Sequence, residues 1–457
     1  MNQLLVRGGT VVTMDKERRI IKDGAVAVQG NRILAVGRTE DIARQYHCDT
    51  VIDANGMAVL PGFVNTHHHG NQTLLRGLGE RFHLMDRLTK IIWPFEGGLT
   101  PQEAYVSTAL GCIELIKAGV TCCNTMEAGD NANESFKAIT DAGIRAEAGQ
   151  AISDRPDAVP ESLQVNPEHA IRENEKLIKS WNGAADGRIR YRVCPRSAFS
   201  CSEELLSGLA QLARHYDIGV HSHADEDWAP LQALLKRTGL PDIEYFHSLE
   251  LTGRKSTMAH CIFVSDKEAK IMHETRTSAA YAPLNPAKSG NGIARISWLI
   301  KCGVQVGLAS DTAGSNTNLD MFEEMRVAGA IQRGTTLDPT ALSTEKLLEL
   351  GTIDGAKALA LDDSIGSIEA GKKADMILID LRKPHLTPVG KRLVSHLVWS
   401  AYASDVDSVI IDGKLVMEHR HLKTLDESDI VDKANKLSEG ILKRLGIEEA
   451  PVWPWIE

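Results

Sequence analysis

The sequence predicts an α/β protein built on a (β/α)8 barrel of the TIM type, with a small β-sandwich assembled from both chain ends. Two observations support this fold. In the middle of the 457-residue chain, eight short apolar runs alternate with helical stretches, which is the pattern of a parallel barrel. At the two ends, by contrast, short β segments are broken by turn residues and no helical alternation is visible.

The eight predicted barrel strands are short and rich in apolar or β-branched residues. They cover 57–65, 119–126, 145–152, 188–195, 218–224, 256–262, 277–283 and 304–311. Between them, 102–119 and 202–217 have the pattern of amphipathic helices, and Ser202 is a favourable N-cap for the second. We therefore assign residues 58–365 to one catalytic barrel.

The chain ends have a different organisation. Residues 1–57 and 366–425 each contain too few strands to form a stable sheet alone, so we expect them to pair as two halves of one β-sandwich. A C-terminal helix and tail are expected over 426–457. The tail contains Trp453 and Trp455, which we expect to be buried against another subunit in a homo-oligomer, a dimer or larger.

Composition narrows the class of function. The net charge of −10 argues against a basic nucleic-acid footprint, and no segment has the apolar length of an export signal or a membrane span. The eight cysteines include adjacent Cys122 and Cys123 but no C-x-x-C pair, which favours reduced thiols, these two as buried strand residues. We expect a cytoplasmic protein that acts on a small molecule, with neither nucleic acid nor membrane as a partner.

The most distinctive stretch is "VLPGFVNTHHHGNQTLLRG", residues 59–77, where three histidines follow an apolar run. On an extended segment, residues i and i+2 face the same side. His67 and His69 would therefore point one way and His68 the other, so that two imidazoles face one metal ion. Considered alone, the run could also be a chance surface cluster.

Further candidate ligands fall at the ends of predicted strands, where the chemistry of such barrels gathers. Each has a structural alternative: His260 could be a core histidine, Asp311 a helix N-cap, and Glu226 a solvated loop acid. Their coincidence at strand ends favours a metal site, although the third and seventh strands contribute no obvious ligand. The candidates are His67, His69, His221, His223, Glu226, His260 and Asp311.

Together these motifs resemble the amidohydrolase superfamily, in particular its mononuclear deaminase and s-triazine hydrolase (atrazine chlorohydrolase-like) branch. The resemblance covers nearly the whole chain and includes "VLPGFVNTHHH", "LLRG", "HADE", "MAHC", "GLASDTAGSN" and "GSIEAGKKADMILIDL". It implies that Glu226, His260 and Asp311 are catalytic and that His221 is a neighbour of the metal site. The metal ligands that it implies are His67, His69, His223 and Asp311.

The resemblance also implies one divalent metal per chain. Binuclear members bridge two metals with a carboxylated lysine on the fourth strand, and "RIRYRVCPRSAF" contains no lysine. Nitrogen and carboxylate ligands suit Zn²⁺ first and Fe²⁺ second. One departure follows the seventh strand, where Tyr281 stands in place of the histidine of many such deaminases. This weakens the case for a standard purine or adenosine pocket, and the s-triazine hydrolases also lack that histidine.

We therefore predict hydrolytic deamination of an amino-substituted N-heterocycle, such as an s-triazine, purine or pterin, with release of ammonia. Asp311 would move the proton of a metal-activated water, Glu226 would protonate the ring nitrogen, and His260 would hydrogen-bond to the attacking oxygen. The predicted substrate-binding residues are Gln72, Trp93, Thr312 and Ser315.

Two alternatives stay open. The same site could displace chloride or an alkylamine from an s-triazine ring. The fold could instead serve as a non-catalytic binding module, but such a relative would be expected to lose ligands, and every ligand position is filled here.

Overall fold

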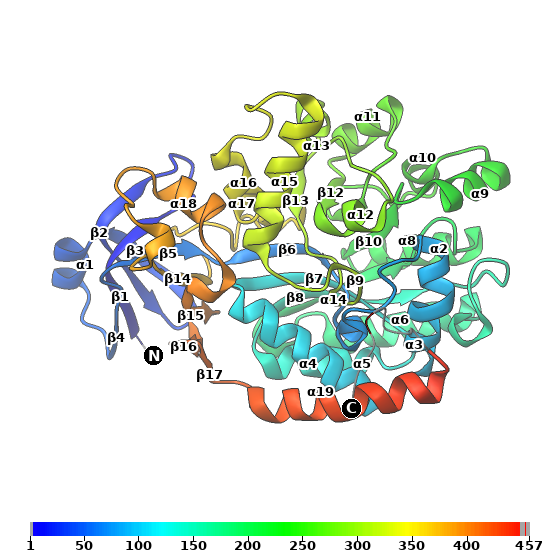
Figure 1. The fold of residues 1–457 in the computed structure, drawn as a ribbon, viewed down its shortest axis with the longest axis horizontal. Helices are drawn as coiled ribbons and strands as arrows, with labels where there is room; N and C mark the ends of the chain where they lie inside the picture. The colour runs from blue at the N-terminus through cyan, green and yellow to red at the C-terminus, as the bar shows by residue number, and fades with distance from the viewer. Residues whose placement is uncertain (1–2, 448–452, 454–457) are drawn as a thin grey trace.

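The computed structural model describes residues 3–447 and Trp453. Eight parallel strands form one sheet in chain order, and a bridge between His68 and Asp311 brings its first and last strands together. The prediction of a (β/α)8 barrel is confirmed (Figure 1). The barrel strands are β6 (Phe63–His68), β7 (Val120–Ala128), β8 (Arg145–Ile152), β9 (Ile189–Pro195), β10 (Gly219–Ala224), β11 (Ser256–His260), β12 (Ser278–Tyr281) and β13 (Val306–Leu308).

The run 57–65, predicted as a single barrel strand, is divided, so that prediction is wrong. β5 (Met57–Pro61) pairs with strands of the chain ends, whereas β6 begins at Phe63 in the barrel. Both strands are fully buried, so apolar composition alone does not reveal where one sheet ends and the other begins. The predicted boundary between residues 57 and 58 falls at the start of β5.

The strands of the two chain ends join in one continuous mixed sheet, to which β5 and β14 are central. The order is β17-β16-β15-β14-β5-β1-β2-β3, with β4 paired to β1. Its remaining strands are β1 (Gln3–Val12), β2 (Ile20–Gln29), β3 (Arg32–Arg38), β4 (Thr50–Asp53), β14 (Met376–Asp380), β15 (Val406–Ile411), β16 (Lys414–Glu418) and β17 (His421–Leu422).

A buried ion pair links the mixed sheet to the barrel. Arg145, the first residue of β8, donates from Nε to Asp375 Oδ2 at 2.7 Å and from Nη2 to Asp412 Oδ1 at 2.9 Å. All three side chains are buried, where removal of one partner would leave an uncompensated charge. The pair therefore fixes how the two sheets are placed.

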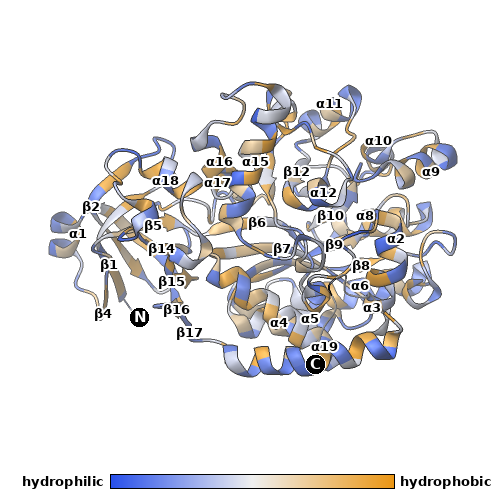
Figure 2. Ribbon diagram, viewed as in Figure 1, coloured by the Kyte–Doolittle hydropathy of each residue, from blue (hydrophilic) through white to orange (hydrophobic). Residues whose placement is uncertain are grey.

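Helices cover the outside of the barrel. Ser202 caps α8 by accepting from Leu205 N, as the sequence predicts, and α19 packs along α4 with Ile430, Ala434 and Ile441 buried (Figure 2). The longer helices are α4 (Pro101–Lys117), α5 (Ala132–Ala142), α6 (Pro167–Trp181), α8 (Glu203–His215), α9 (Trp228–Thr238), α11 (Asp266–Thr275), α15 (Met321–Thr336) and α19 (Glu427–Leu445).

Short helices complete the connections between strands. Two of them follow β6 and begin the wall of the cavity described below: a 3-10 turn at Gly70–Leu75 and α2 (Leu84–Arg87). The other short helices are α1 (Thr39–Gln45), α3 (Trp93–Gly98), α7 (Ala184–Gly187), α10 (Asp242–Ser248), α12 (Leu284–Ser289), α13 (Ile296–Lys301), α14 (Ala313–Asn316), α16 (Thr344–Leu350), α17 (Ile353–Ala358) and α18 (Leu393–Trp399).

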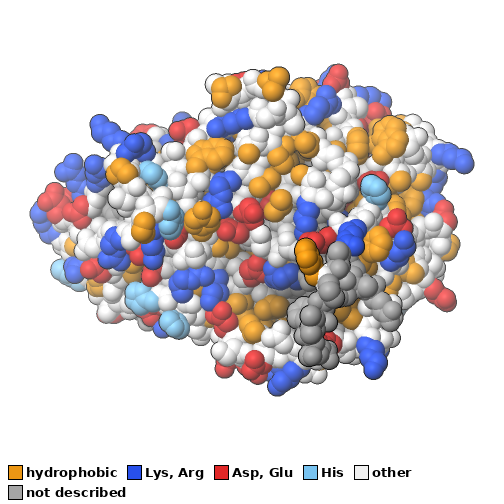
Figure 3. Space-filling view, in the orientation of Figure 1, with side chains coloured by type: hydrophobic (Ala, Val, Ile, Leu, Met, Phe, Trp, Pro, Cys, Tyr) orange, Lys and Arg blue, Asp and Glu red, His pale blue; other side chains and the backbone are white. Residues whose placement is uncertain are grey.

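Acidic and basic side chains are interspersed over the face shown in Figure 3. Cys122 and Cys123 are buried on β7 and unbridged, as expected. Trp453 is 83% exposed on the single chain and Trp455 lies outside the described residues, so their burial against a second subunit stays a prediction.

Within the described part of the chain, every helix is too short or too polar to cross a bilayer.

Gly62, between β5 and β6, permits a close approach that any side chain would prevent. A Cβ there would lie 2.0 Å from Cγ2 and 2.1 Å from Oγ1 of Thr121, which is buried on β7. We expect Gly62→Ala to lower the free energy of unfolding by about 1–3 kcal/mol, because overpacking forces neighbours to shift. Thermal denaturation followed by circular dichroism measures the change.

Gly334→Ala is the matched control. Gly334 lies in α15, and a Cβ there would meet no atom within 4 Å. This substitution should be neutral or stabilising by up to about 1 kcal/mol, since alanine favours a helix over glycine. An unchanged midpoint for Gly62→Ala would show that the approach of Thr121 does not constrain this junction.

Candidate metal centre

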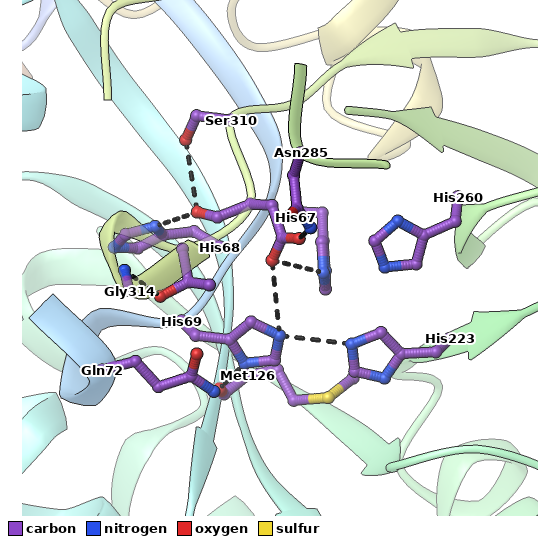
Figure 4. Close-up of polar contacts among 12 residues, drawn as sticks. His67, His68, His69, Gln72, Met126, His223, His260, Asn285, Ser310 and Gly314 are labelled. Carbon is purple, nitrogen blue, oxygen red and sulfur yellow. Dashed lines mark hydrogen bonds and ion pairs between the residues drawn. The ribbon is translucent and has the colours of Figure 1, made fainter. Parts of the chain in front are cut away.

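Four histidines and one aspartate converge at the carboxyl ends of the barrel strands (Figure 4). His67 lies near the end of β6 and His69 follows that strand directly, whereas His223 comes from β10 and His260 from the end of β11. Asp311 lies shortly after β13. All five are buried. The fold therefore brings together the four residues predicted as ligands, with His260 beside them.

The distances between their ligand atoms are those of a compact cluster. His69 Nε2 lies 3.2 Å from His223 Nε2, and Asp311 Oδ1 lies 3.4 Å from His67 Nε2 and 3.8 Å from His69 Nε2. Two sets of three ligand atoms lie within 4.8 Å of one another. They are His67 with His223 and His260, and His67 with His69 and Asp311.

The contact between His69 and His223 indicates that a cation belongs here. His69 Nδ1 lies 2.8 Å from the carbonyl oxygen of Met126, and His223 Nδ1 lies 2.6 Å from that of Arg196. A carbonyl oxygen only accepts, so both Nδ1 atoms carry the proton and both Nε2 atoms of the neutral rings present lone pairs. Burial, the largest effect, lowers the pKa of both histidines and favours these neutral forms. Two lone pairs facing each other repel unless a cation lies between them.

His67 is oriented in the same way by a neighbouring ring. Its Nδ1 lies 2.8 Å from His221 Nε2, which leaves His67 Nε2 facing the cluster without a hydrogen-bond partner among the described residues. Burial lowers the pKa of His67 and His221 well below the ordinary value. Such partners behind the ligands are typical of metal-binding histidines, and the donor set fits a divalent cation.

His68 points away from the cluster, as the alternation of an extended strand predicts. Its Nδ1 lies 2.8 Å from the backbone oxygen of Asp311, so it helps to hold the segment that carries this aspartate. The side chain of Asp311 does not cap helix α14. Thr312 is the N-cap of this helix, because its side chain accepts a hydrogen bond from Gly314 N.

Glu226 and His260 form the other side of the cluster. His260 Nε2 lies 3.5 Å from Glu226 Oε1, and neither ring nitrogen of His260 has a hydrogen-bond partner among the described residues. Burial raises the pKa of Glu226. Burial also opposes ionisation of Asp311, but His260, His69 and His223 outweigh it and hold the pKa of Asp311 below its ordinary value.

The backbone is strained at two of these positions. His260 has φ of +74° and Asp311 has φ of +57°, a left-handed conformation that is costly for residues with a side chain. Strain of this kind persists where the surrounding structure requires it, and here it directs both side chains into the cluster.

The structure also reveals supporting residues that the sequence patterns do not single out. Asn285, in α12 after β12, donates from Nδ2 to Asp311 Oδ2. Glu127, at the end of β7, accepts from the backbone nitrogens of Gly70 at 2.9 Å and Asn71 at 2.8 Å, which fixes the turn directly after His69. Neither residue lies in a recognisable spacing, since each acts through a contact between distant parts of the chain.

A cavity opens next to the cluster, and its wall includes all four predicted substrate-binding residues. Gln72 donates from Nε2 to Glu96 Oε1 at 2.7 Å, while Gln72 Oε1 and Trp93 Nε1 have no hydrogen-bond partner in the described structure. Thr312 and Ser315 lie in the same wall. Tyr281 does not line this cavity, because it is buried in the core with Gln332 Nε2 3.3 Å from its hydroxyl.

The chain is similar to known proteins over nearly its whole length. Residues 58–416 match the family described as Amidohydrolase family, and 24–47 match an imidazolonepropionase-like composite domain of bacteria. A 5-methylthioadenosine/S-adenosylhomocysteine deaminase of Desulforamulus reducens is 34% identical over 94% of this chain and 97% of its own. A 5'-deoxyadenosine deaminase of Methanobrevibacter smithii is 38% identical over 91% of this chain and 93% of its own.

Solved structures agree with these relatives. An adenosine deaminase of Xanthomonas campestris with bound zinc superposes with a TM-score of 0.91 at 27% identity, over 97% of this chain and 99% of the other. An atrazine chlorohydrolase of Arthrobacter aurescens complexed with zinc has a TM-score of 0.88 at 21% identity, over 95% and 100%. The second likeness concerns the fold alone.

The cluster predicts strong stabilisation by metal. Protein stripped with a chelator should gain thermal stability when Zn²⁺ is added at pH 7.5, because a ligand that binds only the folded state stabilises it, by about 4 kcal/mol at a thousandfold excess over the dissociation constant. The titration should saturate near one Zn²⁺ per chain. Differential scanning fluorimetry with metal analysis measures both values.

His223→Ala should lose most of this gain, whereas His215→Ala, a change in the last turn of α8, should retain it. Saturation at two tightly bound ions per chain, both needed for activity, would overturn the single site.

Proposed function

The chain belongs to the amidohydrolase family, and on that premise we propose that it hydrolytically deaminates an amino-substituted N-heterocycle and releases ammonia. The observation that carries this proposal is the convergence of neutral histidine nitrogens with the Asp311 carboxylate, beside a partly buried Glu226 whose pKa is raised by desolvation. Such a site joins a cation to an acid and a base, as hydrolysis of a C–N bond on a ring requires.

His67, His69, His223 and Asp311 would hold one divalent ion. We favour Zn²⁺ over Fe²⁺, and the zinc found in the adenosine deaminase of similar structure supports that choice. When bound, the ion would lower the pKa of water and so supply the nucleophile. A single ion is proposed because β9 contains no lysine that could bridge a second.

Asp311 is the proposed base. Its lowered pKa keeps the carboxylate ionised, so it can accept the proton that the attacking water loses and later pass a proton to the departing amine. Oδ1 faces His67 and His69, while Oδ2 accepts from Asn285 Nδ2. Asn285 therefore fixes the rotation of the carboxylate.

Glu226 is the proposed acid. Burial favours its neutral form, which can protonate the ring nitrogen as the attacked carbon becomes tetrahedral. His260, 3.5 Å from Glu226, has ring nitrogens free to hydrogen-bond to the incoming oxygen. The two carboxyl groups thus have opposite pKa shifts, as expected when one serves as base and the other as acid.

The unpartnered polar atoms of the cavity are proposed to contact the heterocycle. Gln72 Oε1 can accept from a ring N–H or an amino group, and Trp93 Nε1 can donate to a ring nitrogen. Because Tyr281 lies outside the cavity wall, it does not argue against a purine. The deaminases of adenine nucleosides among the relatives support purines as the first substrates to test.

We also propose that the protein is cytoplasmic and that it forms a homo-oligomer. Eight free cysteines, six of them buried, support a reducing compartment such as the cytoplasm. The exposed Trp453 supports contact with a second copy of the chain, since a large apolar side chain gains from being covered.

Substitution of Asp311 tests the proposed base. Asp311→Asn preserves shape and removes the proton acceptor, so we expect kcat to fall by at least about 10³-fold, near the upper range of general acid–base catalysis. Ammonia release from aminotriazines, purines, purine nucleosides and pterins is the measurement, with metal content determined on the same samples. Turnover at the wild-type rate would remove Asp311 from the mechanism.

The leaving group gives a second test. Thr312 Oγ1 accepts from Gly314 N at 3.0 Å, which leaves its single proton as the one donor it can offer to a departing halide. An amine can instead be protonated by Asp311. We expect amino substrates to exceed matched chloro analogues in kcat/KM by at least about tenfold, roughly 1.4 kcal/mol. Equal or faster chloride release from the same ring would place the protein with the dechlorinating hydrolases.

A further inference from the structure

Arg87 is a buried arginine in the wall of the cavity. It is the last residue of α2, is 4% exposed, and lines the cavity together with the apolar side chains of Leu84, Met85 and Leu88. Sequence patterns do not distinguish it, because arginine at the end of a short surface-like helix is ordinary. Its position places a guanidinium in the same cavity as Glu226 and Asp311.

The guanidinium of Arg87 has few hydrogen-bond partners and no carboxylate partner among the described residues. Its Nη1 donates to Ser289 Oγ at 2.5 Å, and its Nε is buried without a hydrogen-bond partner among the described residues. No described carboxylate lies within ion-pair distance of it. An unpaired buried charge is costly, and burial lowers the pKa of this guanidinium.

The other buried arginines are all paired. Arg145 lies 2.7 Å from Asp375, Arg192 lies 2.8 Å from Glu147, and Arg196 lies 2.7 Å from Glu96. The fold therefore neutralises a buried guanidinium wherever it needs one for structure. Arg87 departs from that rule in the wall of a cavity, where a ligand could supply the missing anion.

A chain of hydrogen bonds connects Arg87 with the proposed base. Ser289 Oγ accepts from Arg87 and donates to Asn285 Oδ1 at 3.2 Å, and Asn285 Nδ2 donates to Asp311 Oδ2. Three hydrogen bonds thus separate the guanidinium from the carboxylate at the reacting centre. An anion bound by Arg87 would therefore share the cavity with a heterocycle at the reacting centre.

We infer that Arg87 binds a carboxylate carried on or next to the heterocyclic ring, so that the substrate is an amino-heterocyclic carboxylic acid. The inference rests on the proposed deaminase function. A guanidinium matches a carboxylate in geometry and in its single charge. A phosphate, with close to two negative charges, would be left undercompensated, because Arg196 is paired with Glu96 and Lys288 with Glu80.

Matched substrate pairs test this subsite. The pairs are 6-aminopurine-2-carboxylate, 4-aminopyrimidine-5-carboxylate and pterin-6-carboxylate, each against its carboxamide. The wild-type protein should favour the carboxylate of at least one pair by at least tenfold in kcat/KM. Arg87→Gln should remove most of that preference, by lowering kcat/KM for the carboxylate far more than for its carboxamide. Arg87→Lys should retain part of it, since the charge remains and the planar fork is lost.

Arg81→Gln is the matched control, because Arg81 is exposed in the loop before α2 and should leave both members of each pair unchanged. Equal rates for every carboxylate and carboxamide would overturn the subsite. So would a preference that survives Arg87→Gln, or an equal loss for both members of a pair in that variant.

Binding without turnover separates this inference from the proposed reaction. The deaminated carboxylate products should raise the thermal midpoint of the wild-type protein more than their carboxamides do, and this difference should vanish in Arg87→Gln. If no pair releases ammonia but carboxylate binding depends on Arg87, the subsite is supported, and the wider substrate panel given above decides the proposed reaction separately. Equal stabilisation by product carboxylate and carboxamide overturns the subsite itself.

Discussion

The site depends on an interaction that is unfavourable until a cation relieves it. The Nε2 atoms of His69 and His223 lie 3.2 Å apart, and the carbonyl oxygens of Met126 and Arg196 hold the ring protons on the far side of both rings. The two carbonyl groups, one in β7 and the other directly after β9, hold both rings so that their lone pairs face each other. Much of the barrel can therefore be regarded as a frame that prevents the two imidazoles from separating or rotating.

The electrostatics of the cavity follow from the same burial. Desolvation favours the neutral form of Glu226, whereas Asp311, surrounded by histidines, is favoured as an anion. The pKa values of the two carboxyl groups are thus shifted in opposite directions within one cavity. Arg87 adds a positive charge to these two acids without contacting either, so the cavity can hold an anionic group without neutralising the base.

Much of the site could be predicted from the sequence because its ligands lie at the ends of apolar runs. His67, His223 and Asp311 each lie at or just after a strand, and parallel strands bring their ends to one side of a barrel. The division of 57–65 could not be seen, since β5 is apolar, β6 begins with the apolar Phe63 and Val64, and both strands are buried. Asn285 and Arg87 escaped prediction because their roles depend on contacts between segments far apart in the chain. Tyr281 is the last residue of β12 rather than a residue after the seventh strand, and its side chain turns into the core.

The pairing of β5 with β14 has a consequence for the order in which the protein assembles. β5 leaves the ribosome an entire barrel before β14, its antiparallel neighbour in the mixed sheet. Until β14 is made, one edge of the apolar strand β5 has no neighbouring strand. An unpaired strand edge can pair with other chains and cause aggregation. The mixed sheet is thus completed only after synthesis has passed β14, and the amino-terminal strands keep an open edge until then.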